Sequence, residues 1–369
     1  MADELYVGLM SGTSLDAIDA ALVSIDTDNI ELLSSYQLPI PHALRQQILT
    51  ISSEQKTTLS LLGLIDHKLA KLYATAVINL LEQAKVDASS ITAIGNHGQT
   101  VCHQPTGDSP FTIQLGDANL IAAITGIDTI ADFRRLDIAL GGQGAPLAPA
   151  FHQFLFPQRD STTVVLNIGG IANITVLDAD GNVIGFDTGP GNILMDAWCE
   201  QHTEKSYDHN AQWAQQGQLN NTLLQRILAD NYLSLAPPKS TGREHYNLQW
   251  LESHLPESCL PQDVQRTLCE FTALSTALQV QRYRSGPSNE LLVCGGGAHN
   301  PLVMQQLQQH LPDWLVIPTT ERGISVDYME AMAFAWLARQ RIHNEPCNLP
   351  AVTGAKQQTS LGVLYAAPN

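Results

Sequence analysis

The chain has 369 residues, of which 44% are hydrophobic, so it is long enough to bury large cores and favours two domains over one. Its 36 acidic residues outnumber the 19 lysines and arginines and give a formal net charge of -17, which argues against nucleic acid or an anionic membrane as a partner. The six cysteines have no metal-ligand spacing, and the amino terminus lacks the basic start and long apolar core of a signal peptide. We therefore expect a cytoplasmic protein with reduced thiols that acts on a small molecule.

The stretch 164–198 combines apolar runs with glycine turns and predicts three short strands followed by a helix. The third strand leads to Asp187, which is followed by the turn 188–191 and by Asn192 as the cap of the helix. A carboxylate at a strand end beside a glycine turn often faces a site, so Asp187 is the candidate catalytic residue. The alternative is that Asp187 only shapes the turn.

Two more glycine-rich turns follow predicted strands far from this stretch. The turn 11–14, Ser-Gly-Thr-Ser, follows a strand over 5–10, and Gly295 to Gly297 follow a strand over 290–294. Glycine lets backbone amides approach phosphate oxygens closely, and three such turns together indicate a phosphate-bearing ligand. Asp16 adds a carboxylate for the outer shell of a Mg²⁺ ion. Taken alone, the turn 11–14 is more typical of an ordinary hairpin.

Polar side chains elsewhere are candidates for substrate contacts. His97, Gln99 and Thr100 follow a predicted strand over 91–95, at a connection that should open onto a cleft. Arg134 precedes a glycine loop and is a natural clamp for a substrate carboxylate, although a solvated charge cluster would also explain it. Glu330 lies in the first turn of a predicted helix, where an acid also serves as a partner of the helix dipole.

The remaining pattern is that of an alternating α/β protein. Helical spacing dominates 41–85 and 264–278, and further helices are predicted over 118–126 and 301–311. The charged run before the glycine loop at 141–146 suggests a domain boundary at 132. We expect a first domain over 1–131 with about 348–369, and a second domain over about 132–347.

Six motifs of the chain together resemble the anhydro-N-acetylmuramic acid kinase family, and the resemblance spans essentially the whole chain. They are Gly8 to Asp16, Asp132 to Gly144, Asn167 to Asn173, Gly185 to Asn192, Pro238 to Glu244 and Cys294 to Asn300. The resemblance implies an α/β fold of two actin-like domains, as in sugar kinases and heat-shock ATPases, with two phosphate hairpins and an adenosine loop. One departure is Ala17, where the family usually has glycine after the Leu-Asp pair; this alters hairpin geometry slightly and removes no ligand.

The resemblance also implies the ligands and the residues that hold them. The first hairpin, 12–19, would hold the ATP phosphates, the turn at 167–170 would close on them, and the glycines at 295–297 would lie under the adenosine. The implied ATP-binding residues are Gly12, Thr13, Ser14, Leu15, Asp16, Ala17, Ile18, Asp19, Asn167, Gly169, Gly170, Gly295, Gly296 and Gly297. Asp187 would be the catalytic base, with Mg²⁺ held through water by Asp16, and the family suggests a homodimer.

The implied reaction opens 1,6-anhydro-N-acetylmuramic acid with water and phosphorylates its O6 with ATP, in the recycling of cell-wall sugar. For the sugar pocket we select His97, Gln99, Thr100, Arg134 and Glu330, with Arg134 facing the lactyl carboxylate. Three rivals stay open: another sugar or acyl kinase on the same fold, a non-catalytic nucleotide switch, and a glycosidase that uses Asp187 and Glu330. Only the last has no need for three phosphate turns.

Overall fold

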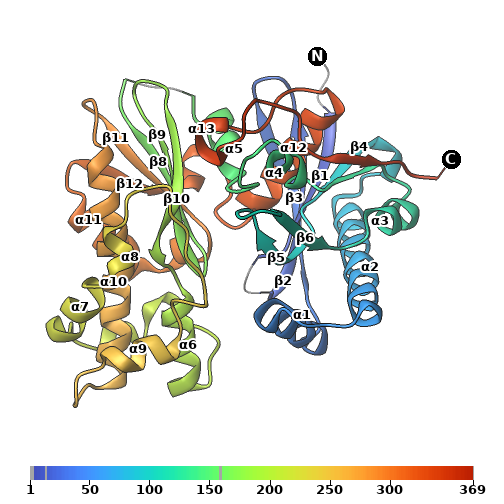
Figure 1. Ribbon diagram of the computed structural model, residues 1–369. Coiled ribbons are helices and arrows are strands. Elements are labelled where there is room, and N and C mark those ends of the chain that lie inside the picture. Colours follow the sequence, from blue (N-terminus) through green and yellow to red (C-terminus); the bar gives the residue numbers. More distant parts are fainter. Residues whose placement is uncertain (1–3, 13–14, 158–159, 369) are drawn as a thin grey trace. The chain divides into compact units, whose positions relative to one another are not determined.

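The computed structural model describes residues 4–12, 15–157 and 160–368 (Figure 1). The chain forms two compact units, Met1–Leu155 with Tyr328–Asn369, and Phe156–Asp327, and each is described by itself. None of the helices in the described ranges has both the length and the apolar character needed to span a bilayer. The two chain segments of the first unit are far apart in the sequence, and the carboxy-terminal segment supplies a central helix to it.

The first unit contains a six-stranded sheet, a two-stranded hairpin and flanking helices. Its strands are β1 Glu4–Met10, β2 Ala17–Ile25, β3 Ile30–Pro39, β4 Ile91–Asn96, β5 Gln99–Gln104, β6 Phe111–Leu115, β7 Thr129–Ala131 and β13 Val363–Tyr365. Its helices are α1 His42–Glu54, α2 Leu59–Ala84, α3 Ala118–Thr125, α4 Arg135–Ala139, α5 Ala148–Leu155, α12 Met329–Ile342 and α13 Pro350–Thr353, with a 3₁₀ turn η1 at Ala88–Ser90.

Two long helices cover opposite faces of this sheet. Val7 and Leu9 of β1 belong to the core formed with α1 and α2. Gly8, which points the other way, lies directly against the backbone of α12 at Ala331, and Gly95 of β4 lies against α12 at Phe334. Because Gly8 and Gly95 are also neighbours across the sheet, α12 crosses at a place where two strands carry no side chain.

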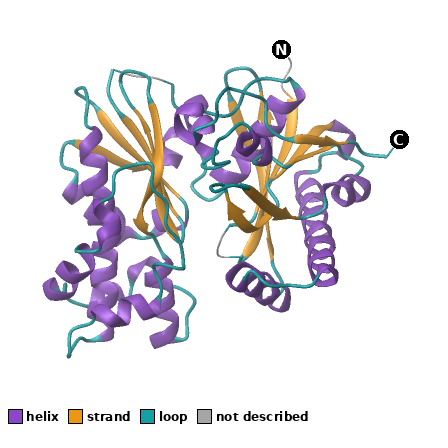
Figure 2. Ribbon diagram, viewed as in Figure 1, coloured by secondary structure: helices purple, strands orange, loops and turns teal. Residues whose placement is uncertain are grey.

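The second unit contains a five-stranded sheet and a larger share of short helices (Figure 2). Its strands are β8 Thr163–Ile168, β9 Ile171–Leu177, β10 Val183–Pro190, β11 Asn289–Cys294 and β12 Trp314–Pro318. Its helices are α6 Ile193–Thr203, α7 Asn221–Leu228, α8 Asn231–Ser234, α9 Leu248–His254, α10 Pro261–Val280 and α11 Pro301–His310. The 3₁₀ turns are η2 His209–Ala211, η3 Ala214–Gln216, η4 Gln281–Tyr283, η5 Gly296–His299 and η6 Thr319–Arg322.

The two sheets repeat one strand order. The first runs β3-β2-β1-β4-β7 and the second β10-β9-β8-β11-β12, with β13 added at one edge of the first. In both, the first three strands form an antiparallel meander and the next two are parallel to its first strand. The expected fold class, α/β with two actin-like domains, is confirmed by this duplicated arrangement.

The boundaries of the compact units differ from the domain limits expected from the sequence. Residues 132–155 and 328–347, expected in the second domain, belong to the first unit. The reason is packing: α12 lies on the first sheet, and Phe151 of α5 contacts Trp336 of α12 with ring centroids 5.8 Å apart. The charged run that begins at 132 therefore lies inside the first compact unit, where Arg135 starts α4.

Candidate functional site

Asp187 lies near the end of β10, where the strand pairing is irregular. Asp187 pairs with Asn173 of β9, and a register shift separates it from Gly189, whose φ is +149°. Thr188 between them is fully buried and donates its hydroxyl hydrogen to the carbonyl of Ala172 at 3.2 Å. The shift is a bulge, a feature that re-aims a side chain at the end of a strand.

The Asp187 carboxylate is held by the loop that follows α8. The Thr241 amide donates to Oδ2 at 3.0 Å, and the Asp187 amide donates to the carbonyl of Lys239 at 3.3 Å. The Tyr232 hydroxyl donates to the carbonyl of Asp187 at 2.8 Å. Backbone and side chain are thus both fixed, which leaves Oδ1 as the oxygen with no hydrogen bond to the described residues.

The environment of Asp187 suits a base that works at neutral pH. Burial raises the pKa of the carboxyl to about 6, and the nearby Glu244 carboxylate adds to the rise. The Thr241 hydrogen bond and the charge of Lys239 act in the other direction and lower the pKa. A base is most effective when its pKa lies just below the working pH, and about 6 meets that condition.

Lys239 is a residue that the sequence reasoning did not single out. Its ammonium donates to the carbonyl oxygens of Tyr232 and Leu233 at 3.2 and 3.3 Å and lies 4.7 Å from the centroid of the Tyr232 ring. Burial lowers its pKa to about 8, the charge of Arg282 lowers it further, and Asp187 raises it. The run 238–244 entered the sequence analysis only as part of a family resemblance, because a lysine in a polar loop carries no signal of its own.

The glycine turns of the second unit lie at the same sheet edge as Asp187. Because β8 and β11 are parallel neighbours, with Cys294 opposite Asn167, their following turns at 169–170 and 295–297 are adjacent. A Cβ on Gly295 or Gly297 would overlap with Asn167 or Ile168, whereas a Cβ on Gly169 or Gly296 would make only an ordinary van der Waals contact. The structure thus brings together the residues predicted around 167–170 and 295–297.

The helix after β10 closes this edge. The amides of Gly191 and Ile193 donate to the carbonyl of Gly170 at 2.9 and 3.1 Å, and the amide of Asn192 donates to the carbonyl of Gly169 at 2.8 Å. The Asn192 side chain makes no cap bond to α6; its amide donates to the carbonyl of Ile168 at 3.1 Å. The expected cap residue is therefore a link between two turns.

The first hairpin is shorter than the sequence suggested. Ala17, Ile18 and Asp19 belong to β2, with Asp19 opposite Met10, so the described part of the turn is 11–12 and 15–16. The predicted ligands Thr13 and Ser14 lie outside the described residues. Asp16 has an exposed side chain and forms an ion pair with Arg45 at 3.0 Å. Leu15 has a φ of +57°, and its amide donates to the carbonyl of Gly12 at 3.2 Å.

The side chains of His97 and Arg134 are hydrogen-bonded to each other, just beyond the end of β4. The Nε and Nη2 groups of Arg134 donate to Nε2 of His97 at 3.1 and 2.8 Å, and Nη1 donates to the carbonyl of Gly144 at 2.7 Å. Burial, and then the charge of Arg134, lower the pKa of His97 well below its usual value. His97 is therefore a neutral acceptor that fixes a guanidinium.

The other predicted sugar contacts differ in accessibility. Gln99 is 4% exposed, accepts from the Ser11 hydroxyl at 2.7 Å and donates to the carbonyl of Thr100 at 3.2 Å. Thr100 accepts from the Gln114 amide at 3.0 Å within the β5–β6 hairpin. Glu330 is exposed in the first turn of α12, and its charge acts on Arg134. Glu330 and Arg134 are thus associated, whereas Gln99 is a packed residue whose substrate contact stays a prediction.

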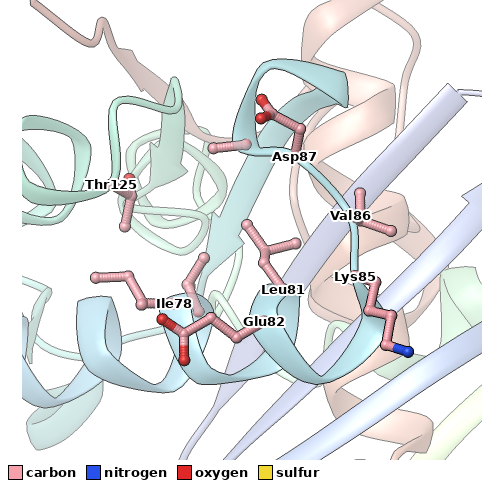
Figure 3. Close-up of a pocket in the computed structure, with 9 residues that line it drawn as sticks. Ile78, Leu81, Glu82, Lys85, Val86, Asp87 and Thr125 are labelled. Atoms are coloured by element: carbon pink, nitrogen blue, oxygen red, sulfur yellow. The ribbon is translucent and has the colours of Figure 1, made fainter.

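No group of three or more metal-binding side chains occurs among the residues that the structure describes. The hollow in Figure 3, about 450 Å³, lies at the end of α2 and is lined mainly by apolar side chains around Leu81 and Val86. It contains none of the candidate site residues. The candidate site is defined instead by its hydrogen bonds and glycine turns.

Comparison with known proteins decides the family. Residues 4–367 match the profile of the family described as anhydro-N-acetylmuramic acid kinase. The chain belongs to this family. Relatives include the anhydro-N-acetylmuramic acid kinases of Vibrio vulnificus strain YJ016, 59% identical, and Pasteurella multocida strain Pm70, 52% identical. The alignments cover 98% of this chain in both cases, and 98% and 96% of the two relatives.

Solved structures resemble this member of the anhydro-N-acetylmuramic acid kinase family less closely. The activator of 2-hydroxyisocaproyl-CoA dehydratase from Clostridium difficile with bound ADPNP is 12% identical, with a TM-score of 0.47, over 90% of this chain and 92% of that chain. A ROK family glucokinase from Streptomyces griseus, in complex with glucose and AMPPNP, is 13% identical, with a TM-score of 0.40. The match covers 91% of this chain and 99% of that chain. The family assignment rests on the sequence relatives.

Proposed function

We propose that this protein is an ATP-dependent kinase that converts 1,6-anhydro-N-acetylmuramic acid and water to N-acetylmuramic acid 6-phosphate, with release of ADP, in the recycling of cell-wall sugar. The substrate and reaction class come from membership of the family. The observation that carries the mechanism is the half-buried Asp187 carboxylate, which the Thr241 amide holds at the edge where two glycine turns meet.

Asp187 acts as the general base in this proposal. It takes a proton from the water that attacks the anomeric carbon, the bond from that carbon to O6 breaks, and O6 accepts the γ-phosphoryl group as the bond to ADP breaks. An oxocarbenium-like centre and a loose phosphoryl transition state then develop in the same reaction. With a pKa of about 6, the carboxyl is ionised at pH 7 and is ready to accept the proton.

The glycine turns hold the nucleotide. Backbone amides at 167–170 approach the phosphates, and Gly296, where an added Cβ would meet only Asn192 at ordinary contact distance, lies beside the adenosine. A Mg²⁺ ion bound mainly by phosphate oxygens and water fits these residues, since it needs only one or two protein carboxylates, and the exposed Asp16 is the candidate. The ion would neutralise phosphate charge.

Arg134 binds the lactyl carboxylate of the sugar in this proposal. The guanidinium is held from one side by His97 and by the carbonyl of Gly144, so its plane is fixed before a ligand arrives. Glu330 is the second contact, an acceptor for sugar hydroxyl groups. The homodimer and the cytoplasmic location stay predictions; light scattering of the purified protein tests the first.

The decisive experiment follows the oxygen atoms. The purified protein is incubated with ATP, Mg²⁺ and the anhydro sugar in ¹⁸O-labelled water, and the product is analysed by mass spectrometry. Label at the anomeric oxygen together with phosphate on O6 is the expected result. Cleavage without ATP indicates a glycosidase, an untouched sugar with phosphorylation of another alcohol indicates another kinase, and nucleotide binding without turnover indicates a switch.

Asp187→Asn tests the base. We expect kcat to fall by about 10² to 10⁴ with nucleotide binding retained, because that is the usual contribution of general acid–base catalysis. For the parent, kcat should fall as pH drops through about 6, where the carboxyl becomes protonated. Turnover within about tenfold of the parent would remove Asp187 from this role.

A further inference from the structure

A closed circuit of hydrogen bonds surrounds Asp187, and Lys239 and Tyr232 each contribute to it twice. The Asp187 amide donates to the carbonyl of Lys239, and the Lys239 ammonium donates to the carbonyl of Tyr232. The Tyr232 hydroxyl then donates to the carbonyl of Asp187 and closes the circuit. The loop that carries Lys239 also brings the Thr241 amide to the carboxylate, 3.0 Å from Oδ2.

Asp230 anchors the two segments of this circuit to the core. One oxygen accepts from the Tyr232 amide at 2.8 Å and caps α8. The other lies within hydrogen-bond distance of His245 and Trp250, at 2.9 and 3.0 Å. Since His245 lies just beyond the loop that holds Lys239, a single carboxylate fixes both ends of the arrangement.

The Lys239 side chain is directed by its hydrogen bonds within the circuit and not by contact with solvent. Its ammonium is half-buried, lies over the Tyr232 ring at 4.7 Å and is 5.8 Å from the centroid of Phe186. Two carbonyl oxygens at the end of α8 accept its protons, which suits a cation near the carboxy-terminal end of a helix. A lysine with these partners has little freedom to move.

We propose that Lys239 and Tyr232 are positioning residues for Asp187, and that the positive charge of Lys239 also favours the ionised carboxylate. The kinetic consequences of this proposal rest on the proposed function, whereas the hydrogen bonds around Asp187 and the titration of its carboxyl group do not. The charged and titratable groups that face the pair are Tyr232 from α8, Glu244 from the same loop and Arg282 from η4. Of these, Glu244 opposes ionisation of Asp187, and Lys239 is the cation that favours it.

Four variants separate the charge from the hydrogen bonds. Lys239→Gln keeps an N–H donor and removes the charge, Lys239→Arg keeps the charge, Lys239→Met removes both, and Tyr232→Phe removes one hydroxyl. Lys205→Met and Tyr207→Phe, which alter exposed residues of the same unit, are the matched controls. Thermal unfolding and circular dichroism establish which variants fold.

The first readout is the titration of Asp187 itself, independent of activity. The aspartate ¹³C carboxyl signal that is absent in Asp187→Asn is followed against pH. In Lys239→Gln and Lys239→Met its midpoint should rise by about one unit, whereas Lys239→Arg and Tyr232→Phe should stay within about 0.3 units of the parent. An unmoved midpoint in a folded Lys239→Gln protein overturns the role of the charge.

The second readout is kinetic. We expect Lys239→Gln to lower kcat at pH 7 by about twofold, because a midpoint near 7 leaves about half of the carboxyl ionised. It should also move the acid limb of the kcat profile upwards and leave the KM for ATP unchanged. Tyr232→Phe should lower kcat by about threefold to tenfold without moving the limb, because only the hydrogen bond is lost. A change confined to the KM for the sugar would make Lys239 a substrate contact and overturn the proposal. If the parent protein fails to turn over the anhydro sugar, the proposed function fails, while the carboxyl titration still decides the role of Lys239.

Discussion

The two sheets have the same strand order and carry different chemistry at matching positions. In the second unit the third residue of the middle strand, Asn173, pairs with Asp187. In the first unit the third residue of the middle strand, Asp19, pairs with Gln37, whose amide donates to it at 3.0 Å. Each unit thus carries one carboxylate in this pair, Asp19 on the middle strand of the first and Asp187 on the neighbouring strand of the second. The same strand order therefore presents different side chains, and Asp187 is the one proposed as the base.

The units also differ in how a helix is joined to the sheet beside the site. In the first, α12 rests on Gly8 and Gly95 by backbone contact. In the second, Thr272 of α10 donates to the carbonyls of Pro190 and Gly191 at 3.2 and 3.0 Å, at the end of β10. Close packing positions Glu330 and hydrogen bonding positions Asp187. The variants below test this contrast.

Gly8→Ala should have the largest effect on stability. The added Cβ would overlap with the carbonyl oxygen of Ala331 and with the amide of Ala335, both in the backbone of a buried helix, so α12 has to shift. We expect the free energy of unfolding of the first unit to fall by about 3 kcal/mol, measured by urea unfolding. The KM for the sugar should rise as well, because Glu330 lies on the displaced helix.

Gly63→Ala is the matched control. Gly63 lies within α2 with no atom near the place of a new Cβ, so alanine should raise stability by about 0.5 to 1 kcal/mol through its better helix propensity. If both substitutions change stability by less than about 0.5 kcal/mol, the close contact of α12 with the sheet is not what holds this helix.

His97→Phe tests the oriented guanidinium of the first unit. An aromatic ring is kept, but Nε2, which accepts from Nε and Nη2 of Arg134, is lost. A charged donor left without its acceptor should lower the free energy of unfolding by about 2 kcal/mol and raise the KM for the sugar. His67→Phe, at an exposed position of α2, is the control. Unchanged stability and KM would show that Arg134 is held well enough by Gly144 alone.

Much of the site was predictable because its signals are local. Glycine after an apolar run marks a strand end, and this rule found the turns at 169–170 and 295–297. Asp187 was found in the same way, from a carboxylate next to a glycine turn. The duplicated sheets were implied by the family motifs, and the strands predicted within 164–198 and over 290–294 are present.

The features that the sequence did not reveal depend on contacts between distant segments. The strands β3 and β5–β6 were not predicted, since Ile30–Pro39 mixes polar and apolar residues and β5 was interpreted as a polar loop. The role of Lys239 depends on Tyr232 and Phe186 from other elements. The burial of Gln99 depends on Ser11, 88 residues away. No local pattern reports such pairings.

Asp187→Asn should stabilise the second unit, opposite in sign to the effects in the first. The folded pKa of about 6 lies above the usual value of 3.8, so the native state binds the proton more tightly and ionisation weakens it. The loss of folding stability caused by this ionisation is absent below pH 4, grows between pH 4 and 6, and is complete above pH 6. Asparagine removes it, so the variant should be more stable by about 2 kcal/mol at pH 8 and by almost nothing at pH 4. Unfolding curves at the two pH values measure the difference. An equal increase in the free energy of unfolding at both would mean that the charge of Asp187 does not destabilise the folded protein.

Thr272→Val should have the smallest effect and separates the two ways of joining helix to sheet. Valine keeps the shape of the buried side chain and removes the donor that two backbone carbonyls at the end of β10 share. We expect a loss of about 1 kcal/mol in the free energy of unfolding, together with a fall in kcat, because the end of β10 leads directly from Asp187. Thr75→Val is the control: Thr75 is exposed on α2 and bonds only within its own helix, to the carbonyl of Lys71, so its loss should stay within about 0.5 kcal/mol. If Thr272→Val leaves kcat unchanged, the hydrogen bonds to α10 serve stability alone, and the circuit through Lys239 and Tyr232 is sufficient to position Asp187.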